Sequence, residues 1–137
     1  MLGLRQILVK EALSKRRICQ FLELVFNLPS CHILISQQQD EELPSIADWS
    51  GIRLWCQVAD LSGDARLMLN LSRYEDSLSI LNGLCYACIR MQVTAFLDID
   101  NHNKYLCIEK DKLYPVFMDE ERVSYSKSET AIYFYTL

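Results

Sequence analysis

The spacing of apolar residues predicts a helical N-terminal region. From residue 3 to residue 27, apolar side chains recur at intervals of three and four residues, which is the spacing of one helix face. Ser14 and the basic run Lys15-Arg16-Arg17 interrupt this spacing, so the segment is predicted as one helix or as a pair of short helices. Pro29 ends the region, because proline cannot continue a helix and pushes the preceding residue away from helical backbone angles.

The same spacing predicts a central helix from residue 72 to about residue 90. Ser72 followed by Glu75 has the pattern of a capping box, in which two side chains satisfy backbone N–H groups at the start of a helix. Gly83 is expected to weaken this helix modestly, because glycine loses more conformational freedom than alanine when it folds.

Alternation of apolar and polar residues, with a period of two, predicts strands over much of the remaining chain. Polar turns join several of these strands into hairpins, and Ser62-Gly63-Asp64 is one such turn signal. The predicted strands are 31–36, 52–60, 66–71, 93–99, 104–109, 114–118, 122–125 and 130–136.

Strand hairpins together with two helical segments predict an α+β fold. We expect a mainly antiparallel sheet of about five to seven strands, with the N-terminal helix (or helix pair) and the central helix packed on it. The 137 residues are expected to form a single domain, 1–137. Half of the residues are apolar and 23% are charged, which is ordinary for a globular protein and excludes a disordered chain.

The composition also predicts where the protein resides. Charges interrupt every apolar stretch before it reaches the roughly 20 residues that a membrane-spanning helix needs. The basic cluster near the N-terminus follows the apolar part, which is the reverse of the order in a signal peptide. We therefore expect a cytoplasmic protein with no membrane partner. Six cysteines lie within apolar runs and are expected to be reduced, buried thiols.

Charge is divided unevenly along the chain. Residues 1–30 carry five Lys/Arg and two acidic residues, a net charge of +3, whereas residues 31–137 carry nine Lys/Arg and sixteen acidic residues, a net charge of −7. A predominantly acidic surface favours a basic protein partner. The basic run Lys15-Arg16-Arg17 supplies only three charges, and we interpret it as a solvated helix face with no role in nucleic-acid binding.

Candidate catalytic and metal-binding groups do not form a complete site. Cys85 and Cys88 make the only C-x-x-C pair, and a structural zinc site needs two further ligands, so they are predicted as core cysteines. Asp98 and Asp100 share one face of a predicted strand, which leaves a small carboxylate-based enzyme as an alternative. Phosphate-binding glycine loops and nucleophile signatures are missing from the sequence. We predict a protein that is not an enzyme and that binds no metal or cofactor.

The C-terminal strand adds tyrosines to the candidate binding surface. If Ile132 and Phe134 face the core, the period of two turns Tyr133 and Tyr135 outward, and exposed tyrosine is a frequent interface anchor. The residues predicted to contact a partner are Asp40, Glu41, Glu42, Asp98, Asp100, Asp119, Glu120, Glu121, Tyr133 and Tyr135.

In general profile the chain resembles small bacterial immunity proteins: compact, cytoplasmic, acidic, α+β and without catalytic residues. The resemblance is one of type and covers no specific motif. It implies a protein that binds and neutralises one cognate toxin, often a basic nuclease, whose active site an acidic surface would block. The alternative is a secretion chaperone or a subunit of a complex that buries the N-terminal amphipathic helix against a partner. The carboxylate enzyme is the second alternative.

Overall fold

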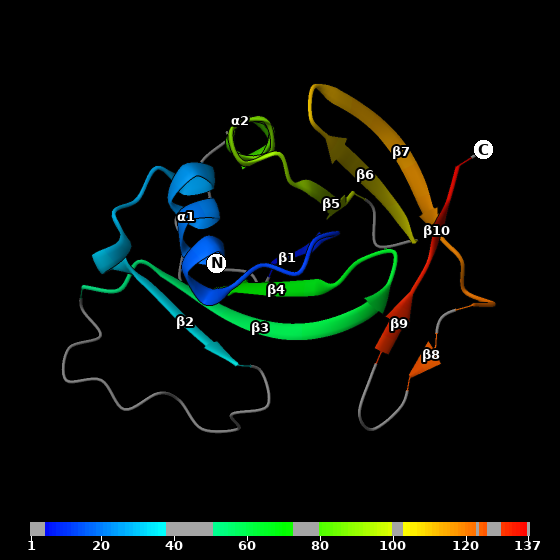
Figure 1. The fold of residues 1–137 in the computed structure, drawn as a ribbon, viewed down its shortest axis with the longest axis horizontal. Helices are drawn as coiled ribbons and strands as arrows, with labels where there is room; N and C mark the ends of the chain where they lie inside the picture. Colours follow the sequence, from blue (N-terminus) through cyan, green and yellow to red (C-terminus); the bar gives the residue numbers. More distant parts are fainter. Residues whose placement is uncertain are drawn as a thin grey trace.

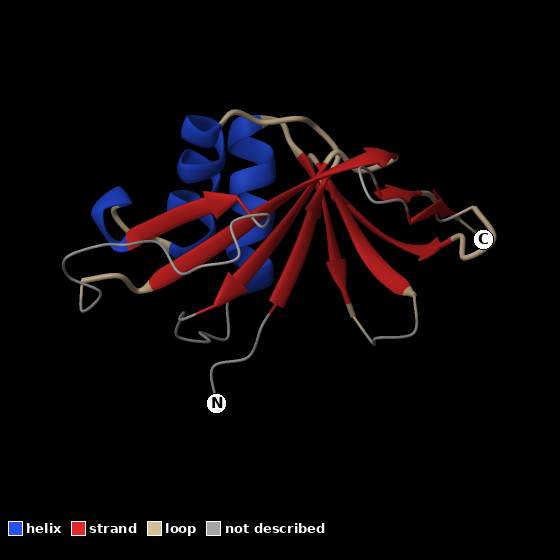
Figure 2. Cartoon of the chain, turned by 90° about the horizontal axis from the view of Figure 1, so that it is seen from below, coloured by secondary structure: helices blue, strands red, loops and turns tan. Residues whose placement is uncertain are grey.

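The computed structural model describes residues 5–37, 51–72, 80–99, 103–122, 124–125 and 130–136. In this part of the chain, two α-helices pack on one face of a large curled sheet, so the predicted α+β class is confirmed (Figures 1 and 2). The helices are α1 (Lys15–Phe26) and α2 (Ile80–Met91), with a short 3₁₀ turn η1 (Ser30–His32). The strands are β1 (Arg5–Val9), β2 (Ile33–Gln37), β3 (Leu54–Gly63), β4 (Leu67–Ser72), β5 (Thr94–Asp98), β6 (Lys104–Glu109), β7 (Lys112–Met118), β8 (Ser124–Tyr125), β9 (Thr130–Ile132) and β10 (Phe134–Tyr135).

The sheet has more strands than predicted, and it is mixed. Among the described residues its order is β10-β7-β6-β5-β1-β4-β3-β9-β8, with β2 beside β3, which makes ten strands. The predicted hairpins β3–β4, β5–β6 and β8–β9 are present and antiparallel. However, β2 and β9 both run parallel to β3. Strand β3 is long enough for its two halves to take different neighbours, which no local pattern in the sequence predicts.

The first predicted helical segment is wrong: residues 5–9 form β1, a central strand between β4 and β5. Ile7, Leu8 and Val9 are all buried, with at most 1% of each side chain exposed, so this strand is covered on both faces. A short continuous apolar run has no unique period, and its spacing fits a helix as well as a strand. The helix begins only at Lys15, where the Ser14 side chain accepts a hydrogen bond from the backbone N–H of Arg17 at 3.2 Å.

The second helix also differs at its start. Ser72, predicted as the helix cap, ends strand β4 and pairs with Trp55 of β3, and the helix is described from Ile80. Glu75 of the predicted capping box lies outside the described residues. Gly83 lies where α2 meets α1, and a Cβ atom there would overlap the carbonyl oxygen of Val25. The glycine therefore allows the two helices to approach closely.

Two cores lie on opposite faces of the sheet. The larger core joins the helices to one face and includes Phe21, Leu22 and Leu84, none of which is measurably exposed. The smaller core lies inside the curl and includes Leu8 and Phe96. Strands β9 and β10 follow each other and cross from the end of β3 to β7, so they bridge the two sides of the curl (Figure 1).

The crossing of β9 over the end of β3 requires glycine. Gly63 has a φ of 91°, in the region that other residues rarely adopt, and a Cβ atom there would overlap the carbonyl oxygen of Ile132. That same oxygen accepts a hydrogen bond from the backbone N–H of Asp64 at 2.8 Å. This close approach holds the C-terminal strands across the smaller core.

Candidate functional site

The acidic residues Asp119-Glu120-Glu121, which we call the acidic turn, follow directly after β7. The backbone N–H of Asp119 donates to the carbonyl oxygen of Tyr133 at 2.8 Å, and this bond attaches the turn to the C-terminal strand. The Asp119 carboxylate accepts from the backbone N–H of Glu121 at 3.2 Å. These bonds fix the backbone of the turn, so that the exposed side chains of Glu120 and Glu121 project from an ordered base.

Asn103, at the end of the β5–β6 connection, supports the turn from the other side. Its side-chain amide donates to the Glu120 carboxylate, and its backbone carbonyl oxygen accepts from the backbone N–H of Met118 at 2.7 Å. Asn103 has a φ of 65°, a left-handed conformation that asparagine tolerates better than most residues. The turn is therefore held by segments that lie far apart in the sequence.

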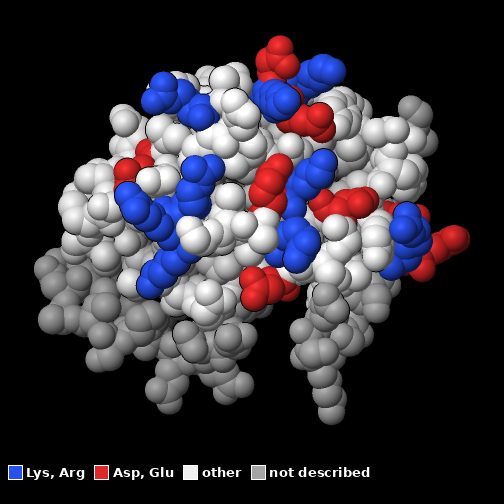
Figure 3. Space-filling model, in the orientation of Figure 1, with Lys and Arg blue, Asp and Glu red and all other residues white. Residues whose placement is uncertain are grey.

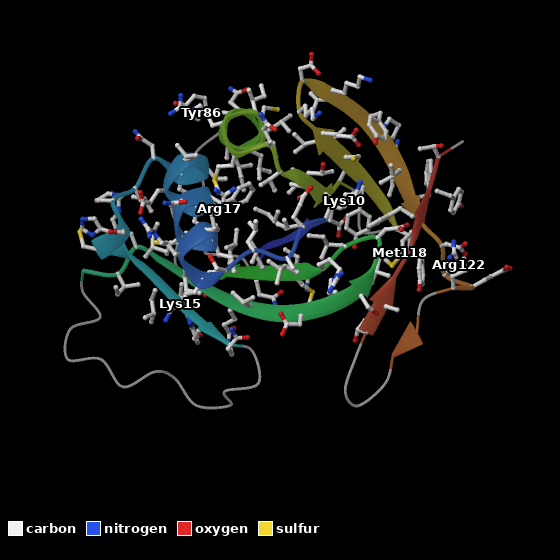
Figure 4. All side chains as sticks on the ribbon, viewed as in Figure 1. Lys10, Lys15, Arg17, Tyr86, Met118 and Arg122 are labelled. Carbon is white, nitrogen blue, oxygen red and sulfur yellow. The ribbon has the colours of Figure 1, made fainter. Side chains whose placement is uncertain are left out.

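Aromatic side chains lie beside the acidic turn. Tyr135 of β10 pairs with Phe117 of β7, and their rings are stacked with centroids 5.7 Å apart. Tyr135 is 47% exposed. The Tyr133 ring is half-buried and lies under the guanidinium of Arg122, which is 4.1 Å from the ring centroid. Arg122 projects at this end of the molecule (Figure 4).

A surface depression of about 510 Å³ joins these groups. It is lined by Asn103, Phe117, Met118, Asp119, Glu120, Glu121 and Tyr135. Carboxylates thus border an aromatic surface, which is the arrangement that suits a lysine or arginine side chain, because the ring face attracts a cation and the carboxylate pairs with it. Figure 3 shows acidic and basic side chains together at the right-hand edge of the view.

The structure brings together five of the ten residues predicted to contact a partner: the acidic turn with Tyr133 and Tyr135. Asp98 ends β5 and does not line the depression. The predicted contacts Asp40, Glu41, Glu42 and Asp100 lie outside the described residues.

Sequence reasoning missed Asn103 and Phe117 as parts of this site. Asn103 belongs to a polar turn whose partner across the sheet is set only by the pairing of β6 with β7. Phe117 alternates with Val116 and Met118 in β7, and its outward position opposite Tyr135 follows from the β7–β10 register. The period of two in the strand could have indicated the outward position of Phe117, but it could not identify β10 as the neighbouring strand.

The expectation that all six cysteines are buried is wrong in part: Cys56, Cys88 and Cys107 are buried, but the other three are not. All six thiols are free. Cys88 is fully buried on α2 and burial is the main cause that raises its pKa to about 12, whereas Cys85 is half-buried and Cys31 is exposed. Within the described residues, no three His, Cys, Asp or Glu side chains gather into a possible metal site.

Two other surfaces bear on the alternatives. The apolar side of α1, formed by Ile18, Phe21, Leu22 and Val25, is buried against the sheet and α2. It is therefore occupied within the chain, whereas Lys15, Arg16 and Arg17 at the start of α1 are exposed and contribute to the basic area over this helix in Figure 3. Neither helix in the described part of the chain has the length and apolar character that crossing a membrane requires.

Comparisons with known proteins found no match for this chain among family models, curated proteins or solved structures.

Proposed function

We propose that this protein is a binding protein that neutralises a cognate toxin with a basic surface, as an immunity protein does. The observation that carries the proposal is the convergence of the acidic turn and Tyr135 on one depression. The sequence contains no catalytic motif that would give these carboxylates another use. Exposed acids steer a cationic partner toward the site, and an adjacent aromatic surface supplies contact area at low entropic cost.

The chain contains its own example of the proposed contact. Arg122, which directly follows the acidic turn, stacks on Tyr133 between β9 and β10. Tyr135 carries a similar ring with 47% of its surface exposed, and Glu121 is exposed beside it in the lining of the depression. A lysine or arginine of the toxin would occupy the position at Tyr135 that Arg122 occupies at Tyr133. A basic residue of an active site would be blocked by such a contact.

The test reverses exposed charge without disturbing the turn. Glu121→Lys changes a side chain that projects into solvent, whereas Asp119 is left intact because its carboxylate and backbone hold the turn. Asp111→Lys is the matched control: it reverses one exposed acid in the β6–β7 hairpin, outside the depression. Co-purification and mass spectrometry identify the partner, and surface plasmon resonance then measures the association rate constant.

We expect Glu121→Lys to lower the association rate constant by about tenfold at 50 mM salt, with a smaller effect at 500 mM, because salt screens exposed charges. Asp111→Lys is expected to change this rate less than twofold. Toxicity assays in cells should show weaker protection by the Glu121 variant. Equal rate constants and equal protection for wild type and both variants would show that the acidic turn is not the binding site.

A further inference from the structure

We propose that a second cavity, inside the curl of the sheet, binds a small zwitterion with an apolar side chain, of the class of free α-amino acids. The cavity has a volume of about 330 Å³. It is lined by Lys10, Asp64, Thr94, Phe96, Cys107, Glu109, Tyr114, Val116, Phe134, Tyr135 and Thr136. This volume lies at the lower end of the range for small-molecule sites, which suits a ligand of amino-acid size.

The register of the sheet arranges the polar lining in one row across three strands. Lys10 continues β1 and its backbone N–H donates to the carbonyl oxygen of Thr94 at 2.9 Å, while Thr94 pairs with Glu109 of β6. Neighbouring strands are about 4.8 Å apart, so Lys10 and Glu109 lie on either side of Thr94, with roughly 10 Å between the Cα atoms of Lys10 and Glu109. The row therefore places a positive group, a hydroxyl and a negative group along one edge of the cavity.

The next row of the same face supplies an apolar floor. Two residues further along each strand, Phe96 pairs with Cys107, and Cys107 pairs with Tyr114. Phe96 and Cys107 are buried, with 6% and 2% exposed. The hydroxyl of Tyr114 donates to the Glu109 carboxylate at 3.0 Å, so this carboxylate is linked to the residues of the floor.

Strand β10 forms the wall of the cavity. The Phe134 ring stacks on Phe96 with centroids 4.4 Å apart, and the backbone N–H of Phe134 donates to the Asp64 carboxylate at 2.8 Å. In Figure 4, Lys10 lies inside the curl of the sheet, on the side of β10. Two interactions therefore hold β10 in place: the stacking of Phe134 on Phe96, and the hydrogen bond to the Asp64 carboxylate in the turn between β3 and β4.

These positions match the three parts of an amino acid. The ligand carboxylate would pair with Lys10, its ammonium with the Glu109 carboxylate, and its side chain would contact Phe96 and Phe134. A ligand with only one of the two charges would leave either Lys10 or Glu109 without its ionic partner, and it would bind more weakly for that reason. Tyr135 lines both this cavity and the depression beside the acidic turn, but the charged residues Lys10 and Glu109 line the cavity and not the depression. The inference therefore does not depend on the toxin-binding proposal.

The test compares three probes that share one ring: L-phenylalanine, phenylacetate and phenethylamine. Each is titrated into the ¹⁵N-labelled protein, and the amide shifts are followed by NMR. We expect saturable shifts with L-phenylalanine at Thr94, Phe96 and Phe134, and at least tenfold weaker binding of each singly charged probe. Absence of saturable shifts with L-phenylalanine, equal affinities for the three probes, or shifts confined to other residues would overturn the proposal.

Two variants then assign the charges. Lys10→Met is expected to weaken the binding of L-phenylalanine at least tenfold and to leave the affinity for phenethylamine unchanged. Glu109→Gln is expected to weaken the binding of L-phenylalanine and to leave the affinity for phenylacetate unchanged. Lys15→Met and Asp111→Asn are matched controls, because both residues are exposed and lie outside the cavity. Variants that bind all three probes like the wild type would refute the assignment. If a variant does not fold by circular dichroism, the three-probe comparison in the wild type still decides.

Discussion

Replacement of Gly83 by alanine tests the contact between the two helices. In an exposed helix this change would stabilise the protein by about 1 kcal/mol, because alanine is the better helix former. In the folded protein the added Cβ atom would lie closer to the carbonyl oxygen of Val25 than the 3.0 Å that real Cβ atoms essentially never cross. The helices must therefore move apart, and the direction of the stability change should reverse.

The magnitude follows from what the separation disturbs. Val25 is 5% exposed, and the nearby core residues Leu22 and Leu84 are fully buried. A gap of 0.5–1 Å removes roughly a quarter to a half of the dispersion energy of each contact, and overpacking in cores costs about 1–3 kcal/mol. The overlap is with a backbone carbonyl that cannot rotate away, so the cost lies near the upper end of this range, about 3 kcal/mol. After subtraction of the helix-propensity gain of about 1 kcal/mol, we expect Gly83→Ala to lower the free energy of unfolding by about 2 kcal/mol and Tm by roughly 5–10 °C.

The assay is urea unfolding followed by circular dichroism at 222 nm. We expect a lower midpoint concentration with an unchanged slope, because the fold is kept and only its stability changes. Asn82→Ala is the control: Asn82 is exposed on the same helix, and its replacement should raise the free energy of unfolding by no more than about 0.7 kcal/mol. A Gly83→Ala variant as stable as the wild type, or more stable, would refute the close approach of α1 and α2.

Three further predictions concern the start of α1, the C-terminal strand and the buried thiols. Ser14→Ala removes the side-chain acceptor at the start of α1 and should lower the free energy of unfolding by about 1 kcal/mol in urea titrations. Asp64→Ala removes the acceptor of the Phe134 N–H and should speed hydrogen exchange of that amide, measured by NMR. Burial raises the pKa of Cys56 and of Cys88 to about 12 from 9.0, so both thiols keep their protons in the folded protein while the unfolded chain loses them. Stability from this source is complete below pH 9 and declines as the pH rises toward 12, which urea midpoints at pH 7 to 10 should detect.

Each of these three has a result that contradicts it. Ser14→Thr keeps the acceptor and should retain most of the stability, so an equal loss in both Ser14 variants would argue against capping. An unchanged exchange rate at Phe134 in the Asp64 variant would mean that β10 is held by other contacts. For the thiols, a midpoint that stays constant or rises between pH 8 and pH 10 would contradict the sign of the linkage. A labelling experiment at pH 8 should find Cys31 reactive before unfolding, since it is exposed.

Local patterns predicted most of the strands and hairpins of this protein. In β3 the alternation of buried and less buried residues holds from Leu54 to Val58, and the leucines of β4 lie on one buried face, so the period of two identified the strands. The turn signal between them identified their antiparallel pairing. The same alternation predicted the directions of Ile132 and Tyr135 in the C-terminal strand, which are buried and exposed respectively. The acidic turn and its neighbouring tyrosines could be named as candidates because charge and aromatic content are visible without a structure.

Tertiary structure decided what those patterns leave open. Ile7, Leu8 and Val9 form a strand because β4 and β5 pair with its two edges, and all three residues are buried. A run this short has no period that separates a strand from a helix. The parallel pairing of β9 with β3 and the return of β10 across the curl depend on contacts between residues about 70 positions apart. The depression beside the acidic turn and the Lys10–Thr94–Glu109 row exist only through that strand order, because register places side chains from distant segments on one face.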